Sequence, residues 1–170
     1  MAAVVEAASD LFAERGPTAT SIRDIAVASH VNHGLVHRHF GSKEGLVAAV
    51  LDHLNHGLVE AADAGDRVEI EDRANRYLRV LARSILDGYD VGALQHHFPM
   101  MSAMVDQARA HHPDDEAARL AAAHVVALQI GWRLFEPFLR SAAGLQGTSA
   151  DTLQASVSAA GALLRSAAPA

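Results

Sequence analysis

Residues 20–43 are TSIRDIAVASHVNHGLVHRHFGSK, a stretch that predicts two short helices joined by a tight break. Thr20 and Ser21 can cap the first helix, whose buried side carries Ile22, Ile25 and Ala26. A three-residue break follows, and Asn32 caps a second helix that runs to Phe40. Two short capped helices separated in this way have the spacing of a helix-turn-helix.

The break between these helices constrains the residue at its centre, His30. One residue in such a break often adopts a positive φ, which Gly takes best and which Asn, Asp and His tolerate better than other side chains. We therefore expect a left-handed backbone at His30, at a cost of about 1 kcal/mol.

The second short helix, residues 32–40, is expected to turn one face away from the protein core. With Val36 at the centre of its buried side and about 100° per residue, Phe40 falls beside Val36 and His39 lies near enough to be half-buried. The opposite side of the helix carries Gly34, Leu35, His37 and Arg38.

That outer face suits duplex DNA. Gly34 lets the backbone approach base edges, Arg38 can reach guanine or phosphate oxygens, and Leu35 can meet a thymine methyl. The Thr20 hydroxyl and the adjacent helix end suit a phosphate. The residue types on this face therefore predict DNA binding.

The composition narrows the class of protein. The 170 residues carry a net charge of −6, which weighs against a nucleic-acid partner, but residues 25–43 contain no acid and hold Arg38, Lys43 and four histidines. Half of the residues are hydrophobic, so a sizeable core can form, and the lack of cysteine excludes disulfides and thiolate metal sites. No apolar run approaches about 18 residues, so we expect a cytoplasmic protein without membrane contact.

Gly and Pro divide the rest of the chain into further helices. The first helix should end at Gly16-Pro17, and a fourth should begin after Gly41-Ser42. Later helices are expected after an Asp66-x-x-Glu69 capping box, at 91–98, at 100–111, from Asp114 with a kink at Pro137, and at 149–166. The chain is thus predicted to be all-α with about nine helices. We place a helix-turn-helix domain, with the start of a connecting helix, at 1–56 and a larger helical domain at 57–170.

Three segments closely resemble the DNA-binding domain of the TetR (tetracycline repressor) family: LFAERG (11–16), ATSIRDIA (19–26) and HFGSKE (39–44). The resemblance covers residues 4–54 without a gap; beyond them only helix count, helix lengths and a long penultimate helix are similar. It implies that the third helix enters the major groove. Phosphate contacts are then expected from Thr20, His33, His37 and Lys43. Base-edge contacts are expected around Asn32, Gly34, Leu35 and Arg38.

The same resemblance implies a transcriptional repressor that binds a palindromic operator as a homodimer and is released by a small-molecule effector. No cofactor and no catalytic residue are expected. Adaptable or aromatic side chains of the larger domain are candidates for the effector pocket, although each one, taken singly, is more often a core residue. These candidates are Tyr77, Leu81, His97, Met101, Met104, Trp132 and Phe135.

Alanines on the last two helices suggest where two copies meet. The penultimate helix carries Ala117, Ala118, Ala121, Ala122 and Ala123, and the last carries Ala155, Ala159, Ala160 and Ala162. Small side chains permit close approach of helices in a four-helix interface around a two-fold axis. Alanine is also simply a good helix former, which is the alternative explanation.

Three features depart from the family pattern. His37 stands where Tyr is usual, and His33 stands where a basic residue is common, which makes the positive charge there depend on pH. The Arg-rich lead-in that many members carry is missing before Val4. Either the natural start lies elsewhere, or affinity rests on fewer phosphate contacts.

Other functions remain open at this point. His33 and His37 lack an adjacent carboxylate ligand for a metal, whereas His96, His97, His111, His112 and His124 allow a metal-sensor hypothesis. A helical enzyme or metal-binding bundle is the alternative to a regulator, but no di-iron, zinc-protease, phosphate-loop or serine-hydrolase motif occurs. A third possibility is an interaction module that no longer binds DNA, with Arg38 and Lys43 as ordinary solvated charges.

Overall fold

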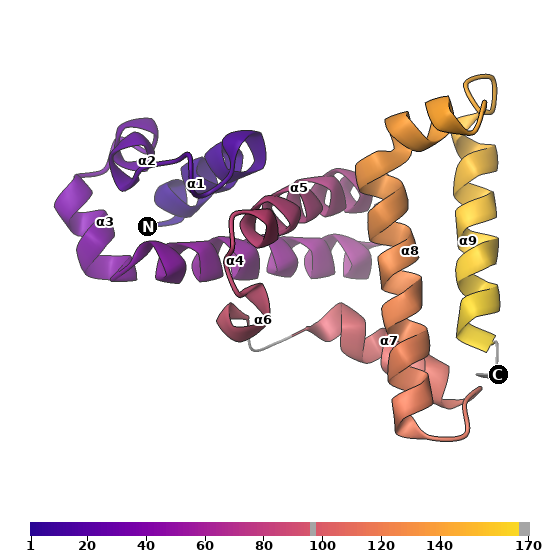
Figure 1. The fold of residues 1–170 in the computed structure, drawn as a ribbon. Coiled ribbons are helices and arrows are strands. Elements are labelled where there is room, and N and C mark those ends of the chain that lie inside the picture. The colour runs from indigo at the N-terminus through magenta and orange to yellow at the C-terminus, as the bar shows by residue number, and fades with distance from the viewer. Residues whose placement is uncertain (96–97, 167–170) are drawn as a thin grey trace. The chain divides into compact units, whose positions relative to one another are not determined.

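The computed structural model describes residues 1–95 and 98–166, and all regular structure in these ranges is α-helical (Figure 1). The all-α prediction is confirmed, with nine helices among the described residues. The chain divides into two compact units, Met1–His97 and Phe98–Ala170. The first contains α1 (Ala2–Arg15), α2 (Ile22–Ala28), α3 (His33–Phe40), α4 (Lys43–Ala64), α5 (Arg67–Leu86) and α6 (Val91–Leu94). The second contains α7 (Pro99–Arg109), α8 (Asp115–Ala142) and α9 (Ala150–Ser166).

The break between α2 and α3 has the expected local structure. Ser21 caps α2 in a complete capping box: its Oγ accepts from the Asp24 N–H at 3.1 Å, and Asp24 Oδ2 accepts from the Ser21 N–H at 2.9 Å. At the start of α3, Asn32 Oδ1 accepts from the Gly34 N–H at 2.8 Å. His30 has a φ of 55°, so the predicted left-handed conformation is confirmed.

One apolar core holds α3 in place within the first unit. Val36 of α3 is fully buried, which fixes the opposite side of this short helix toward the outside. The other large, fully buried side chains come from α1, α2 and α4, and the core extends to α5 and α6. Its members include Phe12, Ile25, Leu46, Leu51, Val80 and Val91.

Helix α4 runs without interruption through residues 56 and 57, where the domain boundary was predicted. Its buried side continues through Leu58 to Ala61, and Gly65, with a φ of 72°, ends the helix. The compact units divide after His97 instead, so α5 and α6 share a unit with the helix-turn-helix. The functional division into 1–56 and 57–170 stays a prediction.

Two further elements differ in detail from the prediction. Helix α6 ends at Leu94, because Gln95 has an extended backbone and is itself almost fully buried. Asp66 caps α5 by accepting two first-turn N–H groups at 3.1 Å, but the capping box is not reciprocal in the predicted way. The Glu69 carboxylate instead accepts from Arg73 Nε at 2.6 Å.

The second unit packs α7 and α9 against α8 around small side chains. Four alanines predicted at the dimer interface (Ala117, Ala118, Ala121 and Ala122) are buried inside this unit, so they are not free to face a partner. The alanine-rich face of α8 packs against α7 and α9 of the same chain, so it does not contact a second copy. Ala123, Ala155, Ala159 and Ala162 are exposed. Helix α8 bends in its C-terminal part (Figure 1), which contains Pro137.

Across residues 1–95 and 98–166, no helix combines the length and apolar character needed to cross a bilayer.

Candidate nucleic-acid interface

The outer side of α3 is open to solvent. His33, Gly34, Leu35, His37 and Arg38 are all exposed, whereas Val36 on the other side is fully buried. Leu35 keeps 41% of its surface exposed although it is a large apolar residue. Base edges in the major groove are recognised by hydrogen-bonding side chains and by apolar contacts with thymine methyl groups. The exposed Leu35 beside Arg38 and the histidines suits such recognition. The structure thus brings together five of the eight predicted DNA contacts on one helix.

Asn32 and Gly34 shape the N-terminal end of this face. The Asn32 side-chain oxygen is occupied by the Gly34 N–H, which leaves its exposed amide group as a donor. A Cβ on Gly34 would meet only Asn32 Oδ1, at 3.2 Å. No other side chain among the described residues covers the backbone at Gly34, and because glycine has no side chain, a DNA base or phosphate can approach this backbone closely.

The predicted phosphate contact of the Thr20 hydroxyl is wrong. Its side chain is fully buried, and its hydroxyl donates to the Gly16 carbonyl at 2.8 Å. The residue that caps α2 is Ser21, so Thr20 closes the preceding turn and does not present its hydroxyl to a phosphate. Sequence spacing alone does not separate two adjacent hydroxyl residues at a helix start.

Lys43 lies at the first position of α4 and is half-buried. Its Nζ is 3.5 Å from the Thr18 carbonyl, which is a long and weak hydrogen bond. Because the remaining ammonium protons are free to turn outward, Lys43 keeps the capacity for a phosphate contact.

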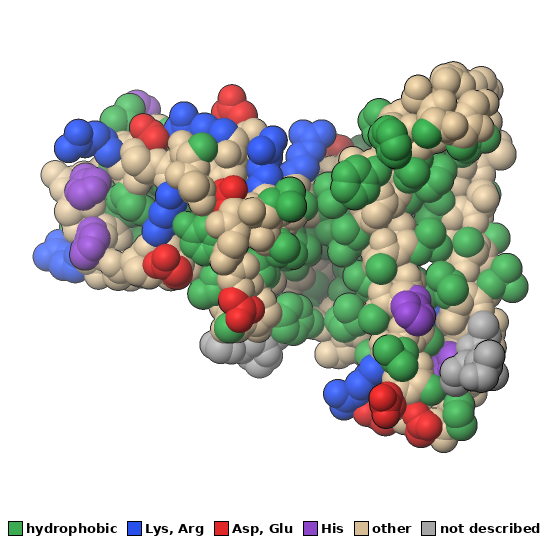
Figure 2. All heavy atoms as spheres, in the orientation of Figure 1, with side chains coloured by type: hydrophobic (Ala, Val, Ile, Leu, Met, Phe, Trp, Pro, Cys, Tyr) green, Lys and Arg blue, Asp and Glu red, His purple; other side chains and the backbone are tan. Residues whose placement is uncertain are grey.

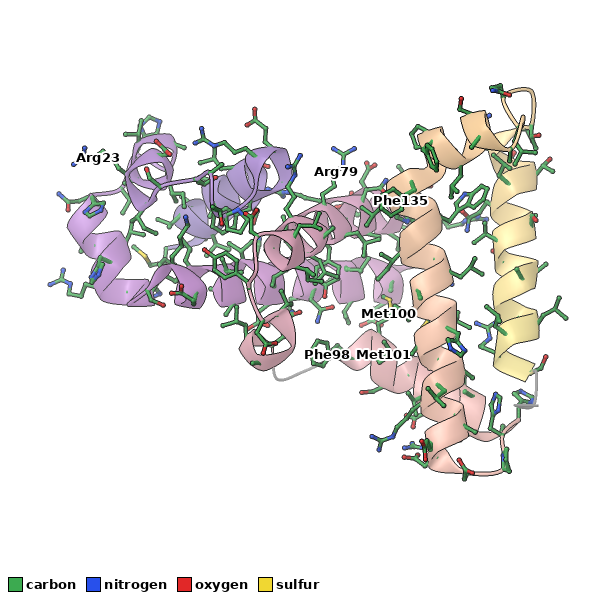
Figure 3. The ribbon with its side chains drawn as sticks, in the orientation of Figure 1. Arg23, Arg79, Phe98, Met100, Met101 and Phe135 are labelled. Atoms are coloured by element: carbon green, nitrogen blue, oxygen red, sulfur yellow. The ribbon has the colours of Figure 1, made fainter. Side chains whose placement is uncertain are left out.

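Arg23 is a cation that the sequence interpretation missed. It is exposed on α2 and points away from the protein (Figure 3), and it has no hydrogen bond or ion pair within the described residues. Figure 2 shows histidine and basic side chains over α2 and α3. The sequence signal was its place at the second position of α2, two residues after the capping Ser21 and to one side of the face centred between Ile25 and Ala26.

Three histidines also lie on or beside this face. His33, His37 and His39 are all exposed. The expectation that His39 is half-buried is wrong, because its ring stands edge-on to Phe40, with centroids 4.7 Å apart, outside the core.

The two acids that flank the acid-free window are engaged locally. Hydrogen bonds from Ser21 lower the pKa of Asp24, which also pairs with Arg15 at 3.2 Å. Hydrogen bonds from its own backbone N–H and from Ser42 lower the pKa of Glu44. Both carboxylates therefore serve helix starts and are negative at neutral pH, and α3 between them carries only neutral or basic groups.

Comparison with known proteins agrees with this geometry. Residues 4–50 match the family model described as bacterial regulatory proteins, tetR family. The HTH-type transcriptional repressor Rv3405c of Mycobacterium tuberculosis is 55% identical over 157 residues, which cover 92% of this chain and 84% of that protein. The HTH-type transcriptional regulator Mb3439c of Mycobacterium bovis matches to the same extent. The chain belongs to the TetR family.

Another relative matches only a short part of the chain. The HTH-type transcriptional repressor KstR2 of Rhodococcus jostii is 46% identical over only 48 residues, 28% of this chain and 24% of that protein. Membership of the TetR family makes the protein a DNA-binding transcriptional regulator and not an enzyme. The enzymatic alternative is therefore set aside.

In this TetR-family chain, a small polar cluster lies in the first unit, between α5 and α6. The Tyr77 hydroxyl donates to Gln95 Oε1 at 3.4 Å, and burial raises the pKa of Tyr77. Gln95 Nε2 and Ser84 Oγ are both buried and have no hydrogen-bond partner among the described residues. Buried polar groups without partners are rare because each costs about 1–3 kcal/mol. Of this polar cluster (Tyr77, Ser84 and Gln95), the sequence had indicated only Tyr77.

The remaining effector candidates divide between the units. Leu81 is half-buried against the core of the first unit. Met101, Met104 and Trp132 are half-buried in the second unit, and Phe135 is exposed there (Figure 3). His97 lies outside the described residues.

A cavity in the second unit contains none of the predicted residues. Its volume is about 390 Å³, and it is lined by Gln107, His111, Ala162, Arg165 and Ser166. Within residues 1–95 and 98–166, no group of three or more histidines or acids is placed to hold a metal ion. His96 and His97, which the metal-sensor hypothesis used, are not among those residues.

Proposed function

We propose that the protein is a transcriptional repressor that binds a palindromic operator as a homodimer and is released by a small-molecule effector. The observation that carries the proposal is the outward face of α3, whose only buried side chain is Val36. The name of the Mycobacterium tuberculosis relative, a transcriptional repressor, supports the direction of regulation. Because its target is DNA, we assign the protein to the cytoplasm.

Each exposed group on α3 has a role in this proposal. Arg38 and Leu35 contact base edges, the backbone at Gly34 allows close approach, and the Asn32 amide donates at the N-terminal end. His33, His37 and Lys43 contact phosphates, which position the helix in the groove. Arg23, on α2, adds a phosphate contact.

Exposed apolar side chains on α8 and α9 support a homodimer. Leu120, Phe138 and Leu163 keep 51%, 67% and 70% of their surface exposed, and Figure 2 shows hydrophobic side chains along both helices. On α8, Leu120, Ala123, Ala127, Leu134 and Phe138 recur at helical spacing on the side opposite the buried alanines. A second copy packed on this stripe would bury it, and a two-fold axis would require a palindromic operator.

The polar cluster of Tyr77, Ser84 and Gln95 supports an effector site in the first unit. A ligand with a hydrogen-bond acceptor would satisfy the Gln95 amide, and Leu81 on the same side of α5 would contact its apolar part. Such a ligand releases the operator only if it binds better to a conformation that fits DNA less well.

Selection of binding sites from a random duplex pool tests the proposal. We expect an enriched inverted repeat whose half-sites lie about one helical turn, or a multiple, apart. Sedimentation of the complex should show two protein chains per site. Enrichment of no sequence, or of a single half-site bound by one chain, would contradict the proposal.

A further inference from the structure

The last turn of α5 contacts the turn that joins α1 to α2. Asp87 Oδ2 accepts a hydrogen bond from the Thr18 N–H at 2.7 Å. Arg83 Nε donates to the Ala13 carbonyl at 3.1 Å. Both contacts join residues about 70 positions apart in the chain. The C-terminal end of α5 therefore contacts the helix-turn-helix domain directly. The groups contacted at positions 13 and 18 belong to the backbone, so a change of side chain there would leave them in place.

The α1–α2 turn that these residues contact is internally fixed. Gly16, with a φ of 82° and a ψ of 161°, ends α1 in a conformation that essentially only glycine adopts. The Thr20 N–H donates to the Pro17 carbonyl at 3.1 Å, and the Thr20 hydroxyl donates to the Gly16 carbonyl at 2.8 Å. Because these hydrogen bonds lie within the turn itself, we expect a displacement of Thr18 to displace the whole turn.

The turn leads straight into the DNA-binding helices. Ser21, directly after Thr20, caps α2, and Arg15 pairs with Asp24 at 3.2 Å across the same turn. Helix α2 in turn shares the buried core with Val36 of α3. The position of α3 is thus connected to Asp87 through the turn and α2.

The same turn of α5 carries Ser84, one of the polar residues named above. Ser84, whose buried hydroxyl has no partner in the described ranges, lies three residues before Asp87, and its carbonyl accepts from the Tyr89 N–H at 3.0 Å. Ser84 therefore lies within one helical turn of the residue that accepts from Thr18.

We propose that Arg83 and Asp87 are positioning residues, the α5 latch, that hold the α1–α2 turn and so set the angle at which α3 meets DNA. This inference rests on the proposed operator binding. Both side chains are exposed, so the latch adds little to folding stability, but its loss lets the helix-turn-helix sample other orientations. Apparent affinity falls in proportion to the fraction of molecules in the binding orientation.

The test compares Asp87→Ala with Asp72→Ala in the full chain, on a duplex selected with the unchanged protein. Asp72 is an exposed acid of the same helix that makes no hydrogen bond or ion pair with α1 or its turn. We expect Asp87→Ala to weaken operator binding about 3–10-fold, with an unchanged salt slope because no phosphate contact is lost. Asp87→Asn, which keeps an acceptor oxygen, should restore most of the affinity. Amide exchange at Thr18 should accelerate only in Asp87→Ala.

These measurements separate the latch from the operator proposal. If the unchanged protein selects no operator, the proposed function fails, while Thr18 exchange still tests the contact. If Asp87→Ala exchanges faster at Thr18 but binds the operator as Asp72→Ala does, the latch is wrong. If Asp87→Ala does not fold, Arg83→Ala replaces it with the same expected loss, and unchanged affinity of that variant overturns the proposal.

Discussion

The two compact units bury very different side chains. The first has a core of Phe12, Ile25, Leu46 and Leu51, all fully buried, whereas the second buries five alanines and only three larger apolar side chains, Val125, Leu153 and Val157, among its described residues. Conversely, Phe135 and Phe138 of the second unit lie more than half exposed. Since large apolar side chains supply most of the stabilisation from burial, the first unit is stable by its own packing and the second gains by covering α8. The first unit therefore buries its large apolar side chains, whereas the second leaves large apolar side chains of α8 exposed, as the proposed homodimer would require.

The largest expected effect is the loss of Phe12. Phe12→Ala should lower the free energy of unfolding by about 3–5 kcal/mol, because it opens a cavity in the core that holds α3. Denaturant unfolding measures this loss. Leu86→Ala, at an 85% exposed position of the same unit, is the matched control and should change stability by less than about 0.5 kcal/mol. Similar losses in both variants would contradict the described core.

Gly16 connects the core of the first unit to the latch. Gly16→Ala should cost about 2–3 kcal/mol, because its φ and ψ suit glycine and its Cβ would lie 2.7 Å from Asp87 Oδ2. Gly65→Ala, with a φ of 72° and nothing within 4 Å, should cost only about 1 kcal/mol. Adding Asp87→Ala should recover part of the first loss, as measured in a double-mutant cycle, and no recovery would argue against the close contact.

The second unit offers the complementary experiment. Phe138→Asp should raise the dimer dissociation constant at least about tenfold, since it places a charge on the exposed stripe of α8. Val68→Asp, at a 73% exposed position in the first unit, should leave association unchanged. Sedimentation velocity over a dilution series distinguishes the two. An unaffected dimer in Phe138→Asp would place the interface elsewhere.

The smallest effect concerns pH. Hydrogen bonding to Arg76, at 2.6 Å, lowers the pKa of Glu6, so Glu6 stabilises the folded state above the unfolded pKa and ceases to do so as pH falls through the lower folded value. Glu6→Gln should therefore cost less than about 1 kcal/mol at pH 7, and the difference should vanish as the pH falls below the lowered folded-state pKa of Glu6. Asp63→Asn serves as the control in pH-dependent melting, and an equal loss at every pH would refute the pairing.

The helix-turn-helix could be predicted because its signals are local. Caps at Ser21 and Asn32, the left-handed His30 and the burial of Val36 each depend on a few neighbouring residues and were confirmed. The half-buried position of His39, predicted from the same helical pattern, was wrong. The phosphate contact predicted for Thr20 was wrong, because the burial of its hydroxyl depends on how the α1–α2 turn closes. Arg23 was missed although its place on α2 marked it as outward.

Features that depend on distant contacts could not be predicted in the same way. The alanines of α8 look alike on a helical wheel whether they face α7, α9 or a second copy, and only packing shows that Ala118 and Ala121 are internal. The contact of Asp87 with Thr18 joins two turns far apart in the chain. Likewise, Gln95 becomes noticeable only because its amide is buried without a partner in the described residues.

The central claim is that the outward face of α3 recognises DNA. It is tested most directly by measuring operator and non-specific duplex affinity for Arg38→Ala and for Arg79→Ala, an exposed arginine that points away from α5 (Figure 3). We expect Arg38→Ala to lose about 1–3 kcal/mol of operator binding and much of its preference over non-specific DNA, with Arg79→Ala unchanged. Equal operator affinity and preference in the two variants would contradict the claim.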